Sequence, residues 1–285
     1  MRVLIFGVGY VGLPLAQALS AEGVHVVTAT SKPARVSELT NAGFQTLVAD
    51  ITNASTLHNF PVVDVVVNLV SSSGGGPEDY HRIYVDGTRN LLHALPTSVS
   101  RFVQASSTSV YAQDDGEWVD EDSPTSPEAA TGQALVAMEQ MVRNHFKGIV
   151  LRISGIYGPG RGHLFKQFVA GQARITGKPE RHLNMVHRDD IVTAFQSAVH
   201  GKGSGNLYNI TDDEPVRQTD FYHWLAAQLN KPIPPRDPSE SPRKRGVTDK
   251  CVSNRKARHE LGWTLRYPTF REGFAEPLNE IRNSR

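Results

Sequence analysis

Residues 5–18 read Ile-Phe-Gly-Val-Gly-Tyr-Val-Gly-Leu-Pro-Leu-Ala-Gln-Ala, and this stretch decides the fold of the chain. A short apolar strand runs into Gly7, Gly9 and Gly12, and an apolar helical pattern follows. In such a turn the first glycine permits a tight bend, the second lets phosphate oxygens approach the backbone, and the third packs the helix on the strand. Amides at the helix N-terminus then face the anion. The stretch therefore predicts a bound dinucleotide, with contacts from Gly7, Gly9, Tyr10, Val11 and Gly12.

The end of the second expected strand indicates which dinucleotide is bound. NAD is usually held through its ribose hydroxyls by an acid about 20 residues beyond the glycines. Between Glu22 and Glu38 the sequence has no acid. Hydroxyls and cations, which suit a 2′-phosphate, stand there instead: Thr30, Ser31, Lys32 and Arg35. This pattern favours NADP as the cofactor. The alternative is NAD, with these residues forming a solvated loop whose cations contact only water.

Length and composition limit the class of protein. The 285 residues allow one large α/β domain, or one domain with a smaller appendage. A net charge of +1 argues against nucleic-acid or membrane binding through the overall field. The single cysteine, Cys251, excludes an internal disulfide and is compatible with a reducing cytoplasm. Asp64 and Asn68 interrupt the longest apolar run, which is too short to span a membrane. We expect a cytoplasmic protein with a small-molecule partner.

Apolar, β-branched runs alternate with helical stretches along the chain, which is typical of a parallel sheet covered by helices on both faces. We expect strands at 3–6, 24–28, 45–48, 63–69, 101–105, 148–153 and 206–210. We expect helices at 12–21, 34–42, 80–95, 132–144, 164–170, 189–200 and 219–229, with Asp189 and Asp190 capping the sixth. Open α/β sheets bind ligands at the carboxyl ends of their strands. Further cofactor contacts are therefore expected from Asp50, Ile51, Leu69, Val70, Ser71 and Ile156. The proline-rich, basic segment 231–246 is expected to be exposed, either as a lid over a substrate or as a connector.

A series of motifs along nearly the whole chain carries a family resemblance. They lie at 48–51, 84–92, 101–111, 151–161, 187–191, 207–211 and 252–263. In order and spacing they resemble the NAD(P)-dependent epimerase/dehydratase branch of the extended short-chain dehydrogenase/reductase superfamily. The resemblance implies a doubly wound α/β Rossmann fold, with a cofactor-binding domain at 1–155 that is rejoined by about 183–213. A small C-terminal substrate lobe would comprise 156–182 and 214–285. Members often dimerise, which here implies a homodimer through helices 80–95 and 132–144.

The chain departs from this family at its proton relay. The family uses a Tyr-x-x-x-Lys pair on one helix face, in which the lysine lowers the pKa of the tyrosine and the tyrosine exchanges a proton with the substrate. By alignment the pair falls on Thr131 and Leu135. The family's helper asparagine is replaced by Tyr84, and its serine is retained as Ser107. The resemblance is therefore to an atypical member.

Other residues are candidates to replace the missing pair. We consider Ser107, Tyr84 and Tyr157 as catalytic residues, with Thr131 kept for its position although its hydroxyl is far less acidic than a phenol. Arg161 and His163 follow a Gly-Pro-Gly turn and could bind a phosphate or carboxylate of the substrate. No metal site is expected.

Three functional hypotheses follow. The first is an NADP-preferring epimerase/dehydratase-like oxidoreductase, acting on a sugar nucleotide or another small carbonyl or hydroxyl substrate with a non-standard proton donor. The second is a catalytically weak or inactive NADP(H)-binding sensor, which the missing pair favours. The third starts from Gly-Tyr-Val-Gly-Leu-Pro-Leu-Ala, which also resembles the N-terminal signature of UDP-glucose and GDP-mannose 6-dehydrogenases. Those enzymes use a cysteine nucleophile, whereas Cys251 lies near the end of this shorter chain, so we expect that likeness to be confined to the cofactor turn.

Overall fold

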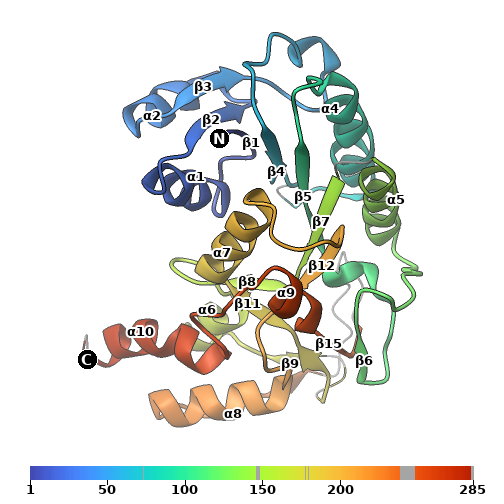
Figure 1. The fold of residues 1–285 in the computed structure, drawn as a ribbon. Coiled ribbons are helices and arrows are strands. Elements are labelled where there is room, and N and C mark those ends of the chain that lie inside the picture. Colours follow the sequence, from blue (N-terminus) through green and yellow to red (C-terminus); the bar gives the residue numbers. More distant parts are fainter. Residues whose placement is uncertain (73, 146–147, 177, 179, 238–247, 284–285) are drawn as a thin grey trace.

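A seven-stranded parallel sheet forms the centre of the computed structural model, which describes residues 1–72, 74–145, 148–176, 178, 180–237 and 248–283 (Figure 1). The strands are β1 (Arg2–Phe6), β2 (His25–Thr30), β3 (Gln45–Val48), β4 (Val65–Asn68), β5 (Arg101–Ser107), β7 (Gly148–Ile153) and β12 (Leu207–Ile210). They run in the order β12-β7-β5-β4-β1-β2-β3. The order reverses between β1 and β4, so a ligand crevice is expected at the carboxyl ends of these two strands. The predicted doubly wound fold is confirmed.

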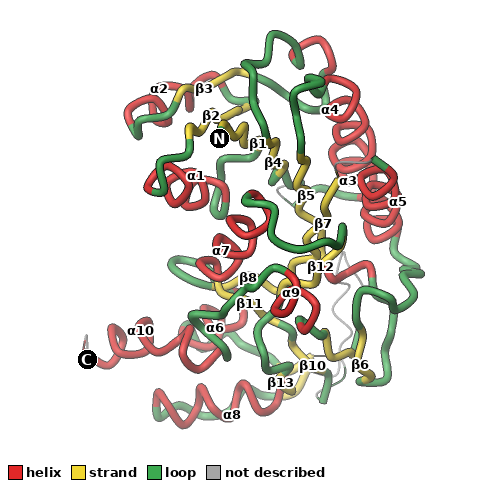
Figure 2. The backbone as a smooth tube through the Cα atoms, in the orientation of Figure 1, coloured by secondary structure: helices red, strands yellow, loops and turns green. Residues whose placement is uncertain are grey.

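Helices cover both faces of this sheet, and β1 shows why (Figure 2). Val3 and Ile5 point to one face and pack with residues of α1 and α7, whereas Leu4 and Phe6 pack with residues of α4 and α5 on the other face. A buried parallel strand must be apolar on both faces to be covered in this way. The helices of the two layers are α1 (Gly12–Ala21), α2 (Val36–Asn41), α3 (Pro77–Tyr80), α4 (Thr88–Ala94), α5 (Ala130–Asn144) and α7 (Arg188–Val199), with a π-helical turn (His81–Gly87) between α3 and α4.

The carboxyl ends of the sheet adjoin a smaller lobe built around α6 (His163–Val169), α8 (Gln218–Leu229) and α10 (Phe270–Asn283) (Figure 1). Its core is an aromatic cluster that includes Phe168, Phe221, Tyr222 and Phe274. Short strands pair around it: β8 (Gly155–Tyr157) with β11 (Met185–His187), β9 (Ile175–Thr176) with β14 (Arg236–Asp237), β10 (His182–Leu183) with β13 (Val216–Arg217), and β6 (Glu117–Val119) with β15 (Lys250–Val252). The last helix before α10, α9 (Arg255–Glu260), returns toward the sheet, where Ala257 packs in the same cluster as β1.

The expected capping of α7 by aspartates is wrong. The N-cap residue is His187, whose Nδ1 accepts a hydrogen bond from the amide of Asp189 at 3.2 Å. Asp190 is buried, and its carboxylate accepts from the amides of Arg266 and Tyr267 at 2.7 and 3.1 Å. This carboxylate therefore fixes the C-terminal tail to the sheet layer instead of closing the helix end.

Two further expectations concern exposed or membrane segments. Most of the proposed lid or connector at 231–246 falls on residues 238–247, outside the described residues. Among the helices that the structure describes, none is both long and apolar enough to cross a membrane.

Candidate cofactor and substrate site

The glycine-rich turn after β1 has two glycines that the fold requires and one that it does not. Gly7 has a φ of +83°, and a Cβ there would collide with the backbone of Leu69 and Val70. A Cβ on Gly12 would collide with the carbonyl oxygen of Gly7. Around Gly9, in contrast, a Cβ would meet no atom within 4 Å. The open space over Gly9 fits the backbone approach that a pyrophosphate needs.

The N-terminus of α1 opens onto the same space. Its N-cap residue, Val11, makes no side-chain capping hydrogen bond, and the first turn carries no acid. The amides of Leu13 and Leu15 already donate to the carbonyls of Gly9 and Val11, both at 3.0 Å, and Pro14 has no amide hydrogen, so the amides of Val11 and Gly12 and the positive end of the helix dipole are what this terminus offers to an anion. This terminus is therefore a ready anion site beside Gly9.

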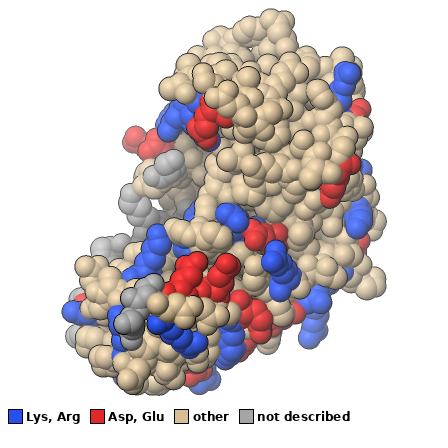
Figure 3. Space-filling view, turned by 90° about the vertical axis from the view of Figure 1, so that its left-hand side faces the viewer, with Lys and Arg blue, Asp and Glu red and all other residues tan. Residues whose placement is uncertain are grey.

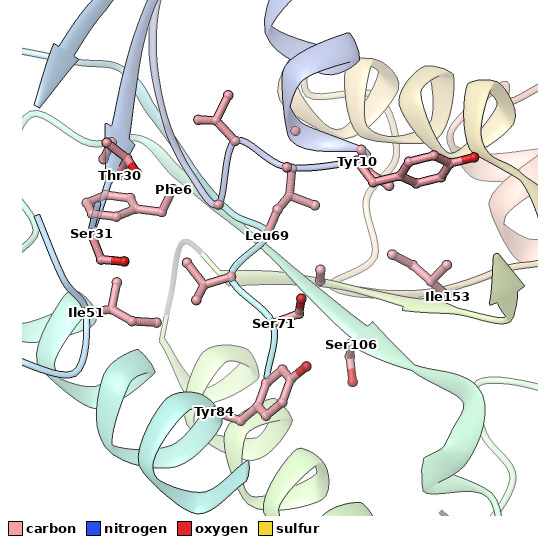
Figure 4. Close-up of a pocket in the computed structure, with 18 of the residues that line it drawn as sticks. Phe6, Tyr10, Thr30, Ser31, Ile51, Leu69, Ser71, Tyr84, Ser106 and Ile153 are labelled. Atoms are coloured by element: carbon pink, nitrogen blue, oxygen red, sulfur yellow. The ribbon is translucent and has the colours of Figure 1, made fainter. Parts of the chain in front are cut away.

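A groove of about 420 Å³ runs from this turn along the carboxyl edge of the sheet (Figure 4). Cofactor and substrate cavities usually hold about 300–1,000 Å³. All the residues predicted to contact the cofactor line it: Gly7, Gly9, Tyr10, Val11, Gly12, Thr30, Ser31, Lys32, Arg35, Asp50, Ile51, Leu69, Val70, Ser71 and Ile156. The structure thus brings together, in one groove, side chains from the ends of six strands.

One end of the groove, beyond β2, is lined by hydroxyls and cations. The guanidinium of Arg35 donates to the carbonyl of Val8 at 2.8 Å, and it also pairs with Glu38 at 2.8 Å. Asp50 is the one acid among the described residues of the groove, and it accepts hydrogen bonds from the amide and hydroxyl of Thr52, both at 2.8 Å. The structure places no carboxylate of this lining at the end of β2, where NAD would need one.

Tyr10 connects the groove to the smaller lobe. Its hydroxyl donates to the carbonyl of Pro159 at 3.0 Å. The guanidinium of Arg161 lies 5.1 Å from the centre of its ring, and that of Arg188 lies at 5.4 Å. Arg161, predicted to bind substrate, thus lies in the lining of the cofactor groove.

Thr131 and Leu135 are the two residues onto which the sequence analysis placed the Tyr-x-x-x-Lys pair. Leu135 is buried and lines the groove where the lysine would stand. Thr131 is buried in the first turn of α5 and lies outside the described lining of the groove. Neither side chain carries a proton as acidic as that of a phenol.

Two of the predicted catalytic residues do face the groove. Tyr84 lies in the π-helical turn, a rare conformation that is frequent at functional sites. Its hydroxyl points into the groove, on the side of Ser71 and Ser106 (Figure 4). Ser107 ends β5, and its hydroxyl accepts a hydrogen bond from the amide of Ser109 at 3.2 Å. Both hydroxyls are within the site that the dinucleotide would occupy.

A second cavity of about 350 Å³ adjoins the groove and shares Ser107, Ser154, Gly155 and Ile156 with it. His163, which was predicted to contact the substrate, lines this cavity. Other residues of its wall come from the aromatic core of the lobe. The two cavities meet at Ser107, which is where a cofactor and a substrate would meet.

Tyr157 lines the second cavity but not the described part of the groove. Its ring stacks on Phe274 at 4.6 Å, and its hydroxyl donates to the carbonyl of Thr269 at 3.3 Å. Burial raises the pKa of this phenol well above its ordinary value. These contacts favour a packing role for Tyr157 over proton transfer.

A buried ionic network contacts Ser106 of β5, and the sequence analysis missed it. Arg152 on β7 pairs with Glu139 on α5 through two nitrogens, at 2.7 and 3.1 Å. Glu139 also accepts from Ser106 at 2.6 Å, and Arg152 donates to the hydroxyl of Tyr111 at 2.8 Å. Two features of the sequence could have indicated this network: Arg152 lies inside an apolar strand, and Glu139 lies on the apolar face of a helix.

Charge on the outer surface is mixed. In Figure 3, Lys, Arg, Asp and Glu side chains gather on the smaller lobe, where both signs alternate, and much of the sheet domain is uncharged in this view. The view accords with a net charge of +1. Specific charge recognition is therefore to be sought inside the cavities.

Residues 3–211, which include the glycine turn, the groove and Ser107, match the model of the NAD dependent epimerase/dehydratase family. The chain belongs to this family. It is 28% identical to Protein YeeZ of Escherichia coli strain K12, over 94% of this chain and 96% of YeeZ. It is 30% identical to a 3-diazoavenalumate denitrifying reductase of a Streptomyces species, over 96% and 99% of the two chains. Among solved structures, MoeE5 in complex with UDP-glucose and NAD is 25% identical, with a TM-score of 0.80 over 100% of this chain and 99% of MoeE5.

Proposed function

We propose that this epimerase/dehydratase-family chain is an NADP-preferring oxidoreductase. NADPH would lie in the groove, and a small carbonyl or hydroxyl substrate, such as a sugar nucleotide, would lie in the second cavity. Residues 1–155 and about 183–213 would hold the cofactor, and residues 156–182 and 214–285 would form the substrate lobe. The observation that carries the proposal is the meeting of the two cavities at Ser107. A relative named as a reductase and a similar structure that contains a dinucleotide together with UDP-glucose support the two-cavity arrangement; that structure contains NAD, so the preference for NADP rests on Lys32 and Arg35 alone.

Each part of the groove has a definite task in this proposal. The amides of α1 and the open space at Gly9 would hold the pyrophosphate. Lys32 and Arg35 would hold the 2′-phosphate, with Arg35 leaving Glu38 for a stronger anionic partner. When bound, NADPH would supply a hydride to a carbonyl substrate, and NADP⁺ would accept one from a hydroxyl substrate. Tyr84 and Ser107 would hold the substrate oxygen and deliver a proton to it.

Removing the two cations should abolish the preference for NADPH. In a Lys32→Ala/Arg35→Ala double variant we expect NADPH affinity to fall by about tenfold or more, because charge-assisted hydrogen bonds to the 2′-phosphate are lost. NADH affinity should stay within about twofold. Calorimetric titration of both nucleotides into both proteins measures this, and an unchanged ratio of the two affinities would count against a 2′-phosphate site.

Tyr84→Phe removes one hydroxyl and keeps the ring, which packs 5.0 Å from the ring of Tyr80. We expect turnover to fall roughly a hundredfold, the usual scale for losing a positioned proton donor, with NADPH affinity unchanged. NADPH oxidation against a panel of aldehydes, ketones and sugar nucleotides provides the assay. Tyr80→Phe removes a second phenol from the same groove lining and shows whether the loss is specific to Tyr84. If the Tyr84 variant turns over as fast as wild type does, Tyr84 is not the proton donor.

The sensor hypothesis remains the second candidate, because the predicted alignment places Thr131 and Leu135 where the family has its tyrosine and lysine. It predicts tight NADPH binding with no consumption of NADPH by any member of the panel. A homodimer through 80–95 and 132–144 also stays a proposal, supported by half-buried Val136, Ala137 and Met141 on α5. Light scattering at several concentrations tests it.

A further inference from the structure

Lys250 is a buried lysine on β15, and it lines the second cavity. It is 5% exposed. Its Nζ donates to the carbonyl of Tyr111 at 3.1 Å and to the hydroxyl of Thr248, which are both neutral acceptors. Within the described part of the chain, no carboxylate forms an ion pair with it. The ammonium group is therefore hydrogen-bonded but lacks an adjacent counter-ion.

The contrast with Arg152 makes this arrangement informative. Arg152 is also buried, but Glu139 neutralises it through direct contacts. A buried charge without such a partner is costly for a fold. Burial accordingly lowers the pKa of Lys250 to about 8, although more distant Asp114, Glu117 and Asp249 oppose that shift. An anion entering the cavity would supply the missing partner.

The lining of the cavity has the charge that an anion needs. Besides Lys250, it contains the basic residues Arg181, His163 and His182, and no aspartate or glutamate stands among its described lining residues. His182 is itself held by Asp249, at 2.9 Å. The lining therefore presents the cations of Lys250 and Arg181 to a ligand, while Asp114, Glu117 and Asp249 lie outside it.

Another wall of the same cavity is aromatic. Tyr157, Phe165, Phe221 and Phe274 line it, and the ring of Phe274 stacks on Tyr157 at 4.6 Å and on Phe165 at 4.7 Å. A volume of about 350 Å³ is near the lower end of the range for ligand cavities. The volume and the aromatic wall fit a ligand with a small apolar or aromatic moiety better than a large polar ligand.

We propose that the second cavity binds a small organic acid, whose carboxylate pairs with Lys250 and whose apolar body lies against the aromatic wall. The identification of this acid as the substrate rests on the proposed function, whereas the anion site itself does not. A nucleoside diphosphate shares the anionic chemistry, and the experiment separates the two.

The test is a calorimetric titration of the protein saturated with NADP⁺, using cinnamate and its neutral analogue cinnamamide as probes. We expect wild type to bind cinnamate at least tenfold more tightly than cinnamamide. Lys250→Met, which keeps the length of the side chain, should remove this difference, and Lys250→Arg should keep most of it. The exposed Lys202→Met is the control and should behave as wild type. Wild-type affinity for cinnamate in Lys250→Met, with the fold confirmed by its melting temperature, would overturn the proposal.

UDP and uridine form the second arm. If UDP binds in a Lys250-dependent manner and cinnamate does not bind, the assignment to a small organic acid is overturned in favour of a nucleoside diphosphate. If NADP⁺ does not bind, the proposed function fails. The same titrations on cofactor-free protein still test the anion site, so failure of the proposed function is distinguished from failure of the anion site.

The pH dependence gives an independent readout. The charged groups near Lys250 are Asp114, Glu117 and Asp249, with His182 on the neighbouring strand. Because the carboxylate needs the protonated ammonium, cinnamate affinity of wild type should fall by up to about tenfold per pH unit above about pH 8, and Lys250→Arg should not show this fall. A flat wild-type profile between about pH 7 and 9.5 would contradict the assignment.

Discussion

A Gly9→Ala variant is expected to fold as wild type does and to lose most of its affinity for NADPH. The added Cβ would meet no protein atom within 4 Å, so it should not disturb the turn. It would instead occupy the space through which phosphate oxygens approach the backbone. We expect Kd for NADPH to rise by at least about tenfold, while the melting temperature stays within about 1 °C. Calorimetry and thermal denaturation measure the two quantities.

Gly12→Ala provides the matched control for this prediction. Its Cβ would collide with the carbonyl oxygen of Gly7, which the backbone cannot easily move. Overpacking of this kind usually costs about 1–3 kcal/mol, so this variant should melt at a lower temperature. If Gly9→Ala binds NADPH as tightly as wild type does, the pyrophosphate does not pass over Gly9 and the groove has another ligand.

Glu139→Gln should be strongly destabilising although it changes the size of the side chain very little. The substitution leaves the buried guanidinium of Arg152 without its carboxylate and weakens the bond from Ser106. Breaking a buried ion pair on one side typically costs about 3–5 kcal/mol. The free energy of unfolding, from guanidinium chloride titration followed by circular dichroism, should fall by about that amount.

The control for the buried pair is an exposed one. Glu38→Gln removes the partner of Arg35 at the surface, where ion pairs contribute little, and we expect no measurable loss of stability. A Glu139→Gln protein as stable as wild type would mean that Arg152 finds other partners, and that the network does not stabilise β5.

Local sequence patterns predict the sheet domain well. The bounds of β3, β7 and α1 agree with the predicted ranges 45–48, 148–153 and 12–21. The reason is physical: a strand that is buried on both faces shows a continuous apolar run, and the glycines of the first turn report contacts made within a few residues. For the same reason the residues of the cofactor groove, which lie at strand ends, were found from the sequence.

The smaller lobe could not be predicted in this way. β15 pairs with β6, and the hydrogen bond between Lys250 and Tyr111 joins residues 139 positions apart. Strands of two or three residues carry no periodicity of their own, and their position depends on these distant contacts. Lys250 was therefore not identified from the sequence, and α10 was not predicted.

Titration of purified, cofactor-free protein with NADPH and then with NADH tests the central claim most directly. The account predicts one NADPH site per chain and an affinity at least about tenfold higher than that for NADH. Equal affinities would contradict the 2′-phosphate site formed by Lys32 and Arg35. Absence of binding by either nucleotide would contradict the assignment of the groove itself.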